Sequence, residues 1–122
     1  MRIMLADNRR KVRFALRALL ERQSGFEVVA EGVDAQDLMA HAESSCPDVV
    51  LLDWELPGMA PRDLLTALRS YCPNVKIIAL SGRVSARREA MDTGVDAFVS
   101  KGDPPEKLLS AIISCEERSA TS

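Results

Sequence analysis

The chain has 122 residues, of which 47% are hydrophobic and 28% are charged, and its formal net charge at pH 7 is -2. This length suits one domain with a buried core and is too short for two, and the small net charge argues against a nucleic-acid or membrane partner. No apolar stretch approaches the roughly 18 residues of a membrane span, and the N-terminus lacks the residue order of a signal peptide. We therefore expect a cytoplasmic protein.

Short apolar runs alternate with amphipathic stretches five times along the chain. The runs are rich in Val, Ile and Leu and predict strands, whereas the stretches between them predict helices. Strict alternation predicts a parallel sheet with right-handed crossovers and helices on both faces. In chain order we expect strand 2–6, helix 9–23, strand 27–31, helix 34–44, strand 48–53, helix 61–71, strand 75–81, helix 86–93, strand 96–100 and helix 105–117.

The first helix has two distinct faces. At roughly 100° per residue, Phe14 points away from the apolar face and lies among charged residues, which makes it a candidate contact for a partner protein. The residues expected to pack on the sheet are Val12, Ala15, Leu16, Leu19 and Leu20.

The third expected strand, VVLLD, ends in an aspartate, Asp53, and a Pro-Gly turn signal follows. A short, continuous apolar run predicts a strand covered on both faces, because a strand with one wet face would alternate. Asp53 then lies at the carboxyl end of its strand, where open α/β sheets place their chemistry.

Polar residues also follow the other strands. The first ends LADN, the fourth ALSG and the fifth VSKG. Each polar residue alone could be a helix cap or a solvated end residue. Together, carboxylates facing a lysine indicate a site for a divalent cation and an anion. Because parallel strands bring their carboxyl ends to one edge, the residues expected there are Asp7, Asn8, Asp53, Ser81 and Lys101.

The three cysteines, Cys46, Cys72 and Cys115, are odd in number, have no C-x-x-C spacing and are accompanied by a single histidine, His41. This pattern supports neither a disulfide framework nor a zinc site. Free cysteine usually behaves as a small buried hydrophobic residue. We therefore expect all three cysteines to be reduced and partly buried.

The strand ends and their spacing make the chain resemble the receiver domains of two-component response regulators. The matching pieces are LADN, LLDWELPGM, ALSG and GVDAFVSK, and GVDAFVSKGDPPEKLLSAI is most similar to the subfamily whose receivers precede a helix-turn-helix DNA-binding domain. The resemblance implies a flavodoxin-like, CheY-like fold with five parallel strands in the order 2-1-3-4-5. We expect the receiver domain over 1–117 and a frayed polar tail over 118–122.

The resemblance also implies the chemistry. Asp53 would accept a phosphoryl group from a histidine kinase or a histidine phosphotransfer protein, so the chain would catalyse only its own phosphotransfer and slow dephosphorylation. Mg²⁺ would be held by Asp53, Asn8 and the backbone carbonyl of Glu55, with Asp7 reaching it through water. Lys101 would pair with the phosphoryl oxygens as a point charge.

The implied output is a conformational switch. In the family, the hydroxyl at the position of Ser81 moves toward a phosphoryl oxygen and the aromatic side chain at the position of Phe98 turns inward. This changes the surface made by the fourth helix, the fifth strand and the fifth helix. For Phe98, plain core packing is the alternative. The implied output partners are a helix-turn-helix domain outside this chain or a second copy of it, with no direct nucleic-acid or membrane contact by this chain.

Four features depart from the family pattern. Asn8 stands where a second acid usually contacts the metal, so we expect Mg²⁺ to bind weakly. Gly102 replaces a proline that often follows the lysine, and the segment between Ser81 and Lys101 is shorter than we expect. Trp54 is a large residue beside Asp53, where it would either shield the phosphoryl group from water or pack in the core.

Two alternative functions stay open at the level of sequence. A phosphorylation-independent receiver would act as a protein-binding module, and Asn8 with the shortened segment supports it. A small phosphohydrolase of the haloacid-dehalogenase kind is the other, because Asp53 and Glu55 are two acids in D-x-E spacing after a strand. That family needs a second aspartate at this position and usually a cap domain, which argues against it.

Overall fold

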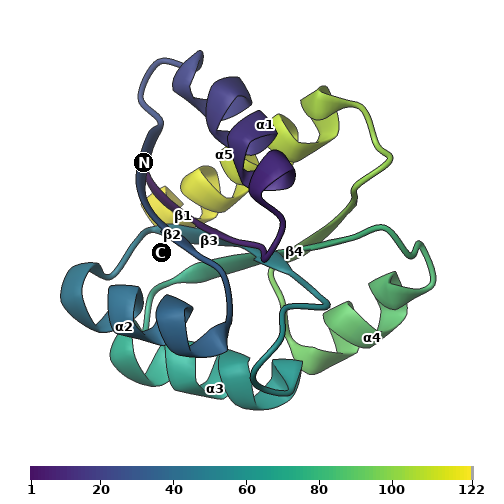
Figure 1. Cartoon of the computed structure of the whole chain (residues 1–122). Coiled ribbons are helices and arrows are strands. Elements are labelled where there is room, and N and C mark those ends of the chain that lie inside the picture. Colours follow the sequence, from purple (N-terminus) through teal and green to yellow (C-terminus); the bar gives the residue numbers. More distant parts are fainter. Residues whose placement is uncertain (122) are drawn as a thin grey trace.

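The computed structural model describes the backbone of residues 1–121 and the side chains of residues 1–118. Five parallel strands form one sheet in the order β2-β1-β3-β4-β5, as predicted (Figure 1). The elements are β1 (Arg2–Ala6), α1 (Arg10–Glu21), β2 (Glu27–Gly32), α2 (Ala35–Ser45), β3 (Val49–Asp53), α3 (Pro61–Tyr71), β4 (Lys76–Ser81), α4 (Ala86–Thr93), β5 (Ala97–Ser100) and α5 (Pro105–Thr121).

The helices form two layers around the sheet. Helices α1 and α5 cover one face, and α2, α3 and α4 cover the other (Figure 1). Successive residues of a strand point to opposite faces, so Val50 and Leu52 join the core under α2 and α3, whereas Val49 and Leu51 join the core under α1 and α5. All five residues of β3 are buried, which explains its unbroken apolar run.

Local sequence signals fix several helix ends. The Asp34 side chain accepts a hydrogen bond from the Asp37 backbone N–H at 2.8 Å and caps α2. Helix α3 begins at Pro61, whose fixed φ suits the first turn. Helix α4 ends at Thr93 and is capped by Gly94, whose left-handed φ of 111° favours glycine.

The last helix is longer than the sequence pattern indicated. Helix α5 continues to Thr121, beyond the expected end at Glu117. The backbone of residues 118–121, where we expected a frayed tail, is therefore helical. Ser122 and the side chains of residues 119–121 lie outside the described part of the chain. Within that part, no helix is both long enough and apolar enough to span a membrane.

Helix α1 packs less closely on the sheet than its apolar pattern predicted. Leu20 is fully buried, and Leu16 and Leu19 are partly buried against the same core. Ala15, which we expected to pack, is exposed. The reason is a groove of about 430 Å³ between α1 and the segment that leads into α5, which leaves part of the helix face uncovered. Phe14 is 76% exposed, on the outward side as expected.

Cys46 and Cys72 form a disulfide, so the expectation of three reduced cysteines is wrong for this pair. Cys46 follows α2 and Cys72 follows α3, and the two helices lie side by side on one face of the sheet (Figure 1). Their Cα atoms are 5.5 Å apart although 26 positions separate them in sequence. The topology creates this pairing, and no local spacing reveals it. Cys115 is free and buried in α5, and burial raises the pKa of its thiol.

Candidate functional site

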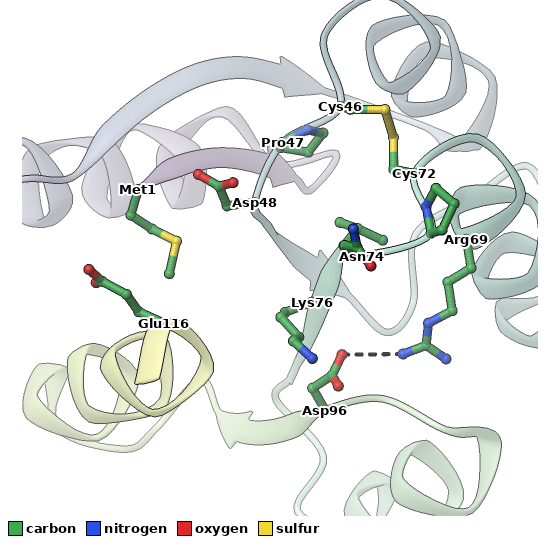
Figure 2. A pocket seen from close by; sticks show the side chains of 12 residues that line it. Met1, Cys46, Pro47, Asp48, Arg69, Cys72, Asn74, Lys76, Asp96 and Glu116 are labelled. Atoms are coloured by element: carbon green, nitrogen blue, oxygen red, sulfur yellow. Dashed lines mark hydrogen bonds and ion pairs between the residues drawn. A yellow bond between two sulfur atoms is a disulfide. The ribbon is translucent and has the colours of Figure 1, made fainter. Parts of the chain in front are cut away.

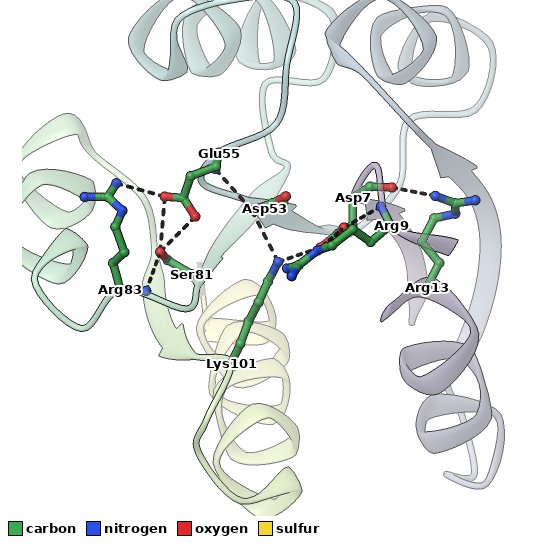
Figure 3. Close-up of polar contacts among 8 residues, drawn as sticks. All are labelled: Asp7, Arg9, Arg13, Asp53, Glu55, Ser81, Arg83 and Lys101. Carbon is green, nitrogen blue, oxygen red and sulfur yellow. Dashed lines mark hydrogen bonds and ion pairs between the residues drawn. The ribbon is translucent and has the colours of Figure 1, made fainter. Parts of the chain in front are cut away.

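The carboxyl edge of the sheet carries the polar side chains that the strand ends predicted (Figure 3). Asp7 directly follows β1, Asp53 is the last residue of β3 and Ser81 is the last residue of β4. Their exposed fractions are 2%, 4% and 0%, and these three are the only buried polar or charged residues among the described side chains. Buried carboxylates need charged or hydrogen-bonding partners, which makes this edge the candidate site.

Lys101 joins the two carboxylates. Its Nζ lies 2.7 Å from Oδ2 of Asp7 and 3.4 Å from Oδ1 of Asp53. The backbone N–H of Lys101 donates to the Ser81 carbonyl at 2.9 Å, which holds the start of the β5–α5 loop against β4. The peptide bond to Gly102 is trans, as are all those of the described residues. The ammonium offsets the repulsion between two carboxylates that share a site.

The loop after β1 is fixed from several sides. Oδ1 of Asp7 accepts a hydrogen bond from the Arg9 backbone N–H at 2.8 Å, and Nε of Arg9 lies 3.6 Å from the same oxygen. Arg13 donates through Nη1 to the Asp7 carbonyl at 2.7 Å and through Nε to Glu31 at 3.1 Å. Asn8, between these anchored residues, is exposed at the rim of the site. Both oxygens of Asp7 are therefore already engaged by protein donors.

The side chain of Glu55 takes part in the site, which the sequence analysis missed. Oγ of Ser81 donates to the Glu55 carboxylate, 3.0 Å from Oε1 and 3.1 Å from Oε2. Nη2 of Arg83 donates to Oε2 of Glu55 at 2.9 Å, and the Arg83 backbone N–H donates to Oγ of Ser81 at 3.0 Å (Figure 3). Two features of the sequence could have indicated this role of Glu55: it is an acid two residues after Asp53, and an arginine, Arg83, lies two residues after Ser81.

Two aromatic residues lie close to this edge. Trp54 is 4% exposed and packs in the core under α2 and α3, and its indole N–H has no hydrogen-bond partner among the described residues. Phe98 is buried in the same core, with the Arg87 guanidinium carbon 5.0 Å from its ring centroid. Phe98 therefore already points inward, and a cation from α4 covers its ring.

The oxygen atoms at this edge are of the chemical type that binds a hard cation. Carboxylate, amide and backbone carbonyl oxygens are the ligands that Mg²⁺ and Ca²⁺ prefer. Within the described chain, however, no group of three or more His, Cys, Asp or Glu is placed to hold a metal ion. The residue at position 8 is an amide, and the carboxylate of Glu55 faces Ser81. The expected Mg²⁺ ligands, Asp7, Asn8, Asp53 and the Glu55 backbone carbonyl, therefore stay a prediction.

Comparison with known proteins identifies the family. The sequence model of the response regulator receiver domain matches residues 3–113. The chain belongs to this family. Receiver domains generally bind Mg²⁺ at their acidic phosphorylation site. They are signalling domains, so membership of this family argues against the phosphohydrolase alternative.

Relatives of this receiver domain are bacterial regulators. The probable transcriptional regulatory protein SgaR of Hyphomicrobium methylovorum is 32% identical over 114 residues, covering 92% of this chain and 54% of SgaR. The response regulator protein VraR of Staphylococcus aureus is 26% identical over 113 residues, covering 91% of this chain and 54% of VraR. The receiver domain thus spans about half the length of these relatives.

Solved structures agree with the receiver fold. A LuxR-family two-component response regulator from Aurantimonas sp. SI85-9A1 has a TM-score of 0.84 at 30% identity, covering 93% of this chain and 82% of that one. A LuxR-family DNA-binding response regulator from Staphylococcus aureus has a TM-score of 0.82 at 29% identity, covering 93% and 97%.

Proposed function

We propose that this receiver domain accepts a phosphoryl group on Asp53 from a histidine kinase or a histidine phosphotransfer protein, and that phosphorylation changes the surface formed by α4, β5 and α5 to control an output. The observation that carries the proposal is the placement of Asp53. Its carboxylate is nearly buried at the end of a rigid central strand and lies 3.4 Å from the Lys101 ammonium. Family membership supports the same reading.

The proposed reaction is an in-line displacement at phosphorus. A carboxylate oxygen of Asp53 forms the new P–O bond while the P–N bond of the phosphohistidine breaks, and the imidazole leaves with the electron pair. Lys101 stabilises the negative charge that collects on the phosphoryl oxygens. Mg²⁺, when held by Asp7, Asn8, Asp53 and the Glu55 carbonyl, would supply further neutralisation. We expect this metal to bind weakly because position 8 is an amide.

The proposed acceptor role is tested by labelling with acetyl phosphate in the presence of Mg²⁺. Intact-mass measurement should show one added phosphoryl group in the wild type and in Asp92→Asn, a change at an exposed aspartate of α4. Asp53→Asn should abolish the label. Absence of label in the wild type would favour the phosphorylation-independent alternative, a protein-binding module, which the engagement of Ser81 by Glu55 and the amide at position 8 support.

Replacing Glu55 by glutamine is expected to speed labelling of Asp53 severalfold. The Ser81 hydroxyl has one proton, and while it donates this proton to Glu55 it cannot donate it to a phosphoryl oxygen. The charged carboxylate of glutamate holds this hydrogen bond more strongly than the neutral amide oxygen of glutamine would. The incoming phosphoryl group also adds roughly -1.5 to -2 charges near the Glu55 carboxylate. The initial rate of acetyl-phosphate labelling measures the effect, with Glu27→Gln, at an exposed glutamate of β2, as the matched control. An unchanged or slower rate would show that Glu55 does not restrain the site.

Phe14 is the proposed contact with the kinase. An exposed phenylalanine among charged residues on α1, the helix that follows the Asp7 loop, is suited to dock a helical histidine-containing domain beside Asp53. For a kinase that phosphorylates the wild type, Phe14→Glu should reduce the rate of phosphotransfer severalfold. The same substitution should leave the rate of acetyl-phosphate labelling unchanged. Val84→Glu, at a 68% exposed apolar residue before α4, should change neither rate. Equal loss of both rates in Phe14→Glu would mean that Phe14 is structural.

The proposed output is control of transcription. The relatives include a probable transcriptional regulator and a DNA-binding response regulator of the LuxR family. We propose a helix-turn-helix output domain outside this chain as the recipient of the switch, with a second copy of the receiver domain as a possible partner. Phe98 would follow Ser81 in the switch, and its packing under Arg87 is the contact that such a movement would change.

A further inference from the structure

The Cys46–Cys72 disulfide lies at the amino edge of the sheet, at the opposite ends of the strands from Asp53. It borders an open cleft of about 1180 Å³ formed by the segments that lead into β3 and β4 (Figure 2). Its two halves differ in access to solvent. Cys46 is exposed, whereas Cys72 is 5% exposed and belongs to the hydrophobic core.

We propose that Cys46–Cys72 is a reversible thiol–disulfide exchange site whose co-reactant is a low-molecular-weight thiol, and that this thiol attacks the sulfur of Cys46. The thiolate of the small molecule forms a mixed disulfide with Cys46, and Cys72 leaves as a thiolate that takes a proton from water. A second small thiol then attacks the mixed disulfide and releases Cys46. The protein disulfide gains two electrons, and two small thiols are oxidised to one small disulfide.

Exposure decides which sulfur reacts. Exchange requires the attacking thiolate to reach one sulfur directly, and exposed disulfides are the labile ones. Both cysteines line the cleft, but Cys46 is exposed, whereas Cys72 is 5% exposed and packs in the core around α2 and α3. The attack at Cys46 also leaves the buried Cys72 as the residue that can reverse the step, because its sulfur remains next to the mixed disulfide and can attack it once its thiol loses the proton again.

The surrounding contacts hold the two cysteines in place independently of the bond. Nη1 of Arg2 donates to the carbonyls of Ser45 and Cys46, at 2.6 and 2.9 Å, and so fixes the end of α2. The phenol of Tyr71 hydrogen-bonds to the Glu43 carboxylate, which links α3 to α2 and raises the pKa of Tyr71. The two thiols of the reduced protein therefore stay close, and this proximity favours re-formation of the disulfide.

The bond closes a covalent loop that contains β3, the Asp53 loop and all of α3. Breaking the bond that closes a loop of this size should lower the stability of the domain substantially, because the unfolded chain gains conformational entropy. For a domain of this length, we expect the melting temperature to fall by about 10 °C on reduction. Labelling of Asp53 should change little, since the contacts of the acid site lie at the other edge of the sheet.

The experiment equilibrates the whole protein in buffers of graded reduced-to-oxidised glutathione ratio, alkylates the free thiols under denaturing conditions and counts them by intact mass. We expect one alkylated cysteine, Cys115, at the oxidising end and three at the reducing end, with the other two appearing together and disappearing again when the ratio is reversed. Three free thiols at every ratio, or a bond that persists at every ratio, would overturn the proposal.

Variants in which one of the two bonded cysteines is replaced test the direction of attack. In Cys72→Ser, glutathione should form a stable mixed disulfide at Cys46; in Cys46→Ser, the buried Cys72 should stay uncapped. Equal capping of both would refute selective attack at Cys46. The glutathione titration and the melting temperatures are measured on the wild type, so they do not depend on whether a variant folds. A melting temperature that does not change on reduction would refute the stabilising role of the disulfide. Because this proposal rests on residues remote from Asp53, the glutathione titration is independent of any failure of acetyl-phosphate labelling.

Discussion

Replacing Lys101 by methionine is expected to destabilise the domain by roughly 3 kcal/mol and to slow labelling of Asp53 by about a hundredfold. The Lys101 ammonium lies within 3.4 Å of two carboxylates that are each less than 5% exposed. Methionine fills most of the same space without the charge, so Asp7 and Asp53 would remain buried without this counter-charge. The stability value lies at the low end of the usual range because Arg9 stays close to Asp7.

Urea unfolding and acetyl-phosphate labelling measure the two effects of Lys101→Met. Lys107→Met, at an exposed lysine of α5, is the matched control and should change neither quantity. Lys101→Arg should recover part of the stability because it keeps the charge, but less of the labelling rate, since the planar guanidinium replaces a compact ammonium. Equal or higher stability of Lys101→Met would show that the two carboxylates do not depend on this cation.

The fold and the meeting of the polar residues follow from simple features of the sequence. Alternation of strands and helices predicts parallel pairing, and parallel pairing requires all strands to end at the same edge. For this reason the residues at the carboxyl ends of β1, β3, β4 and β5 had to approach one another, and the contacts of Lys101 with Asp7 and Asp53 agree with that expectation. Their roles in phosphotransfer remain proposals.

Other features depend on distances that a linear pattern does not contain. The Cys46–Cys72 bond requires α2 and α3 to end at the same height on the same face of the sheet. The direction of the Glu55 side chain depends on donors in β4 and in the loop after it, Ser81 and Arg83, as much as on its own position. Ala15 carries the same apolar signal as Leu16, yet a groove separates it from the next segment.

The charges at the acid site are closely balanced. Asp7 and Asp53 contact Lys101, Asp7 also contacts Arg9, and Glu55 pairs with Arg83. A divalent cation that enters this site meets three carboxylates whose charge three protein cations already oppose. The amide at position 8 leaves this balance unchanged, whereas a carboxylate there would tip it toward metal binding.

Asn8→Asp is therefore expected to tighten Mg²⁺ binding at least tenfold and to lower the melting temperature of the metal-free domain. Asparagine and aspartate at position 8 both offer an oxygen that can coordinate Mg²⁺ directly at about 2 Å, but only the aspartate carboxylate adds a full negative charge. Two unit charges attract by about 4 kcal/mol at 4 Å and an effective dielectric of 20, so even partial screening leaves more than a factor of ten. Without metal, the same charge repels Asp7 and Asp53.

Fluorescence of Trp54, the single tryptophan, follows the Mg²⁺ titration because this buried residue directly follows Asp53 in the chain, and melting curves in chelator report the metal-free stability. Asn74→Asp adds the same charge at an exposed position of the opposite edge and is expected to alter neither measurement. If Asn8→Asp binds Mg²⁺ no more tightly than the wild type, position 8 is not a ligand and the metal does not use the loop after β1. A gain in affinity together with a lower metal-free melting temperature would show that one carboxylate couples both properties, as the charge balance requires.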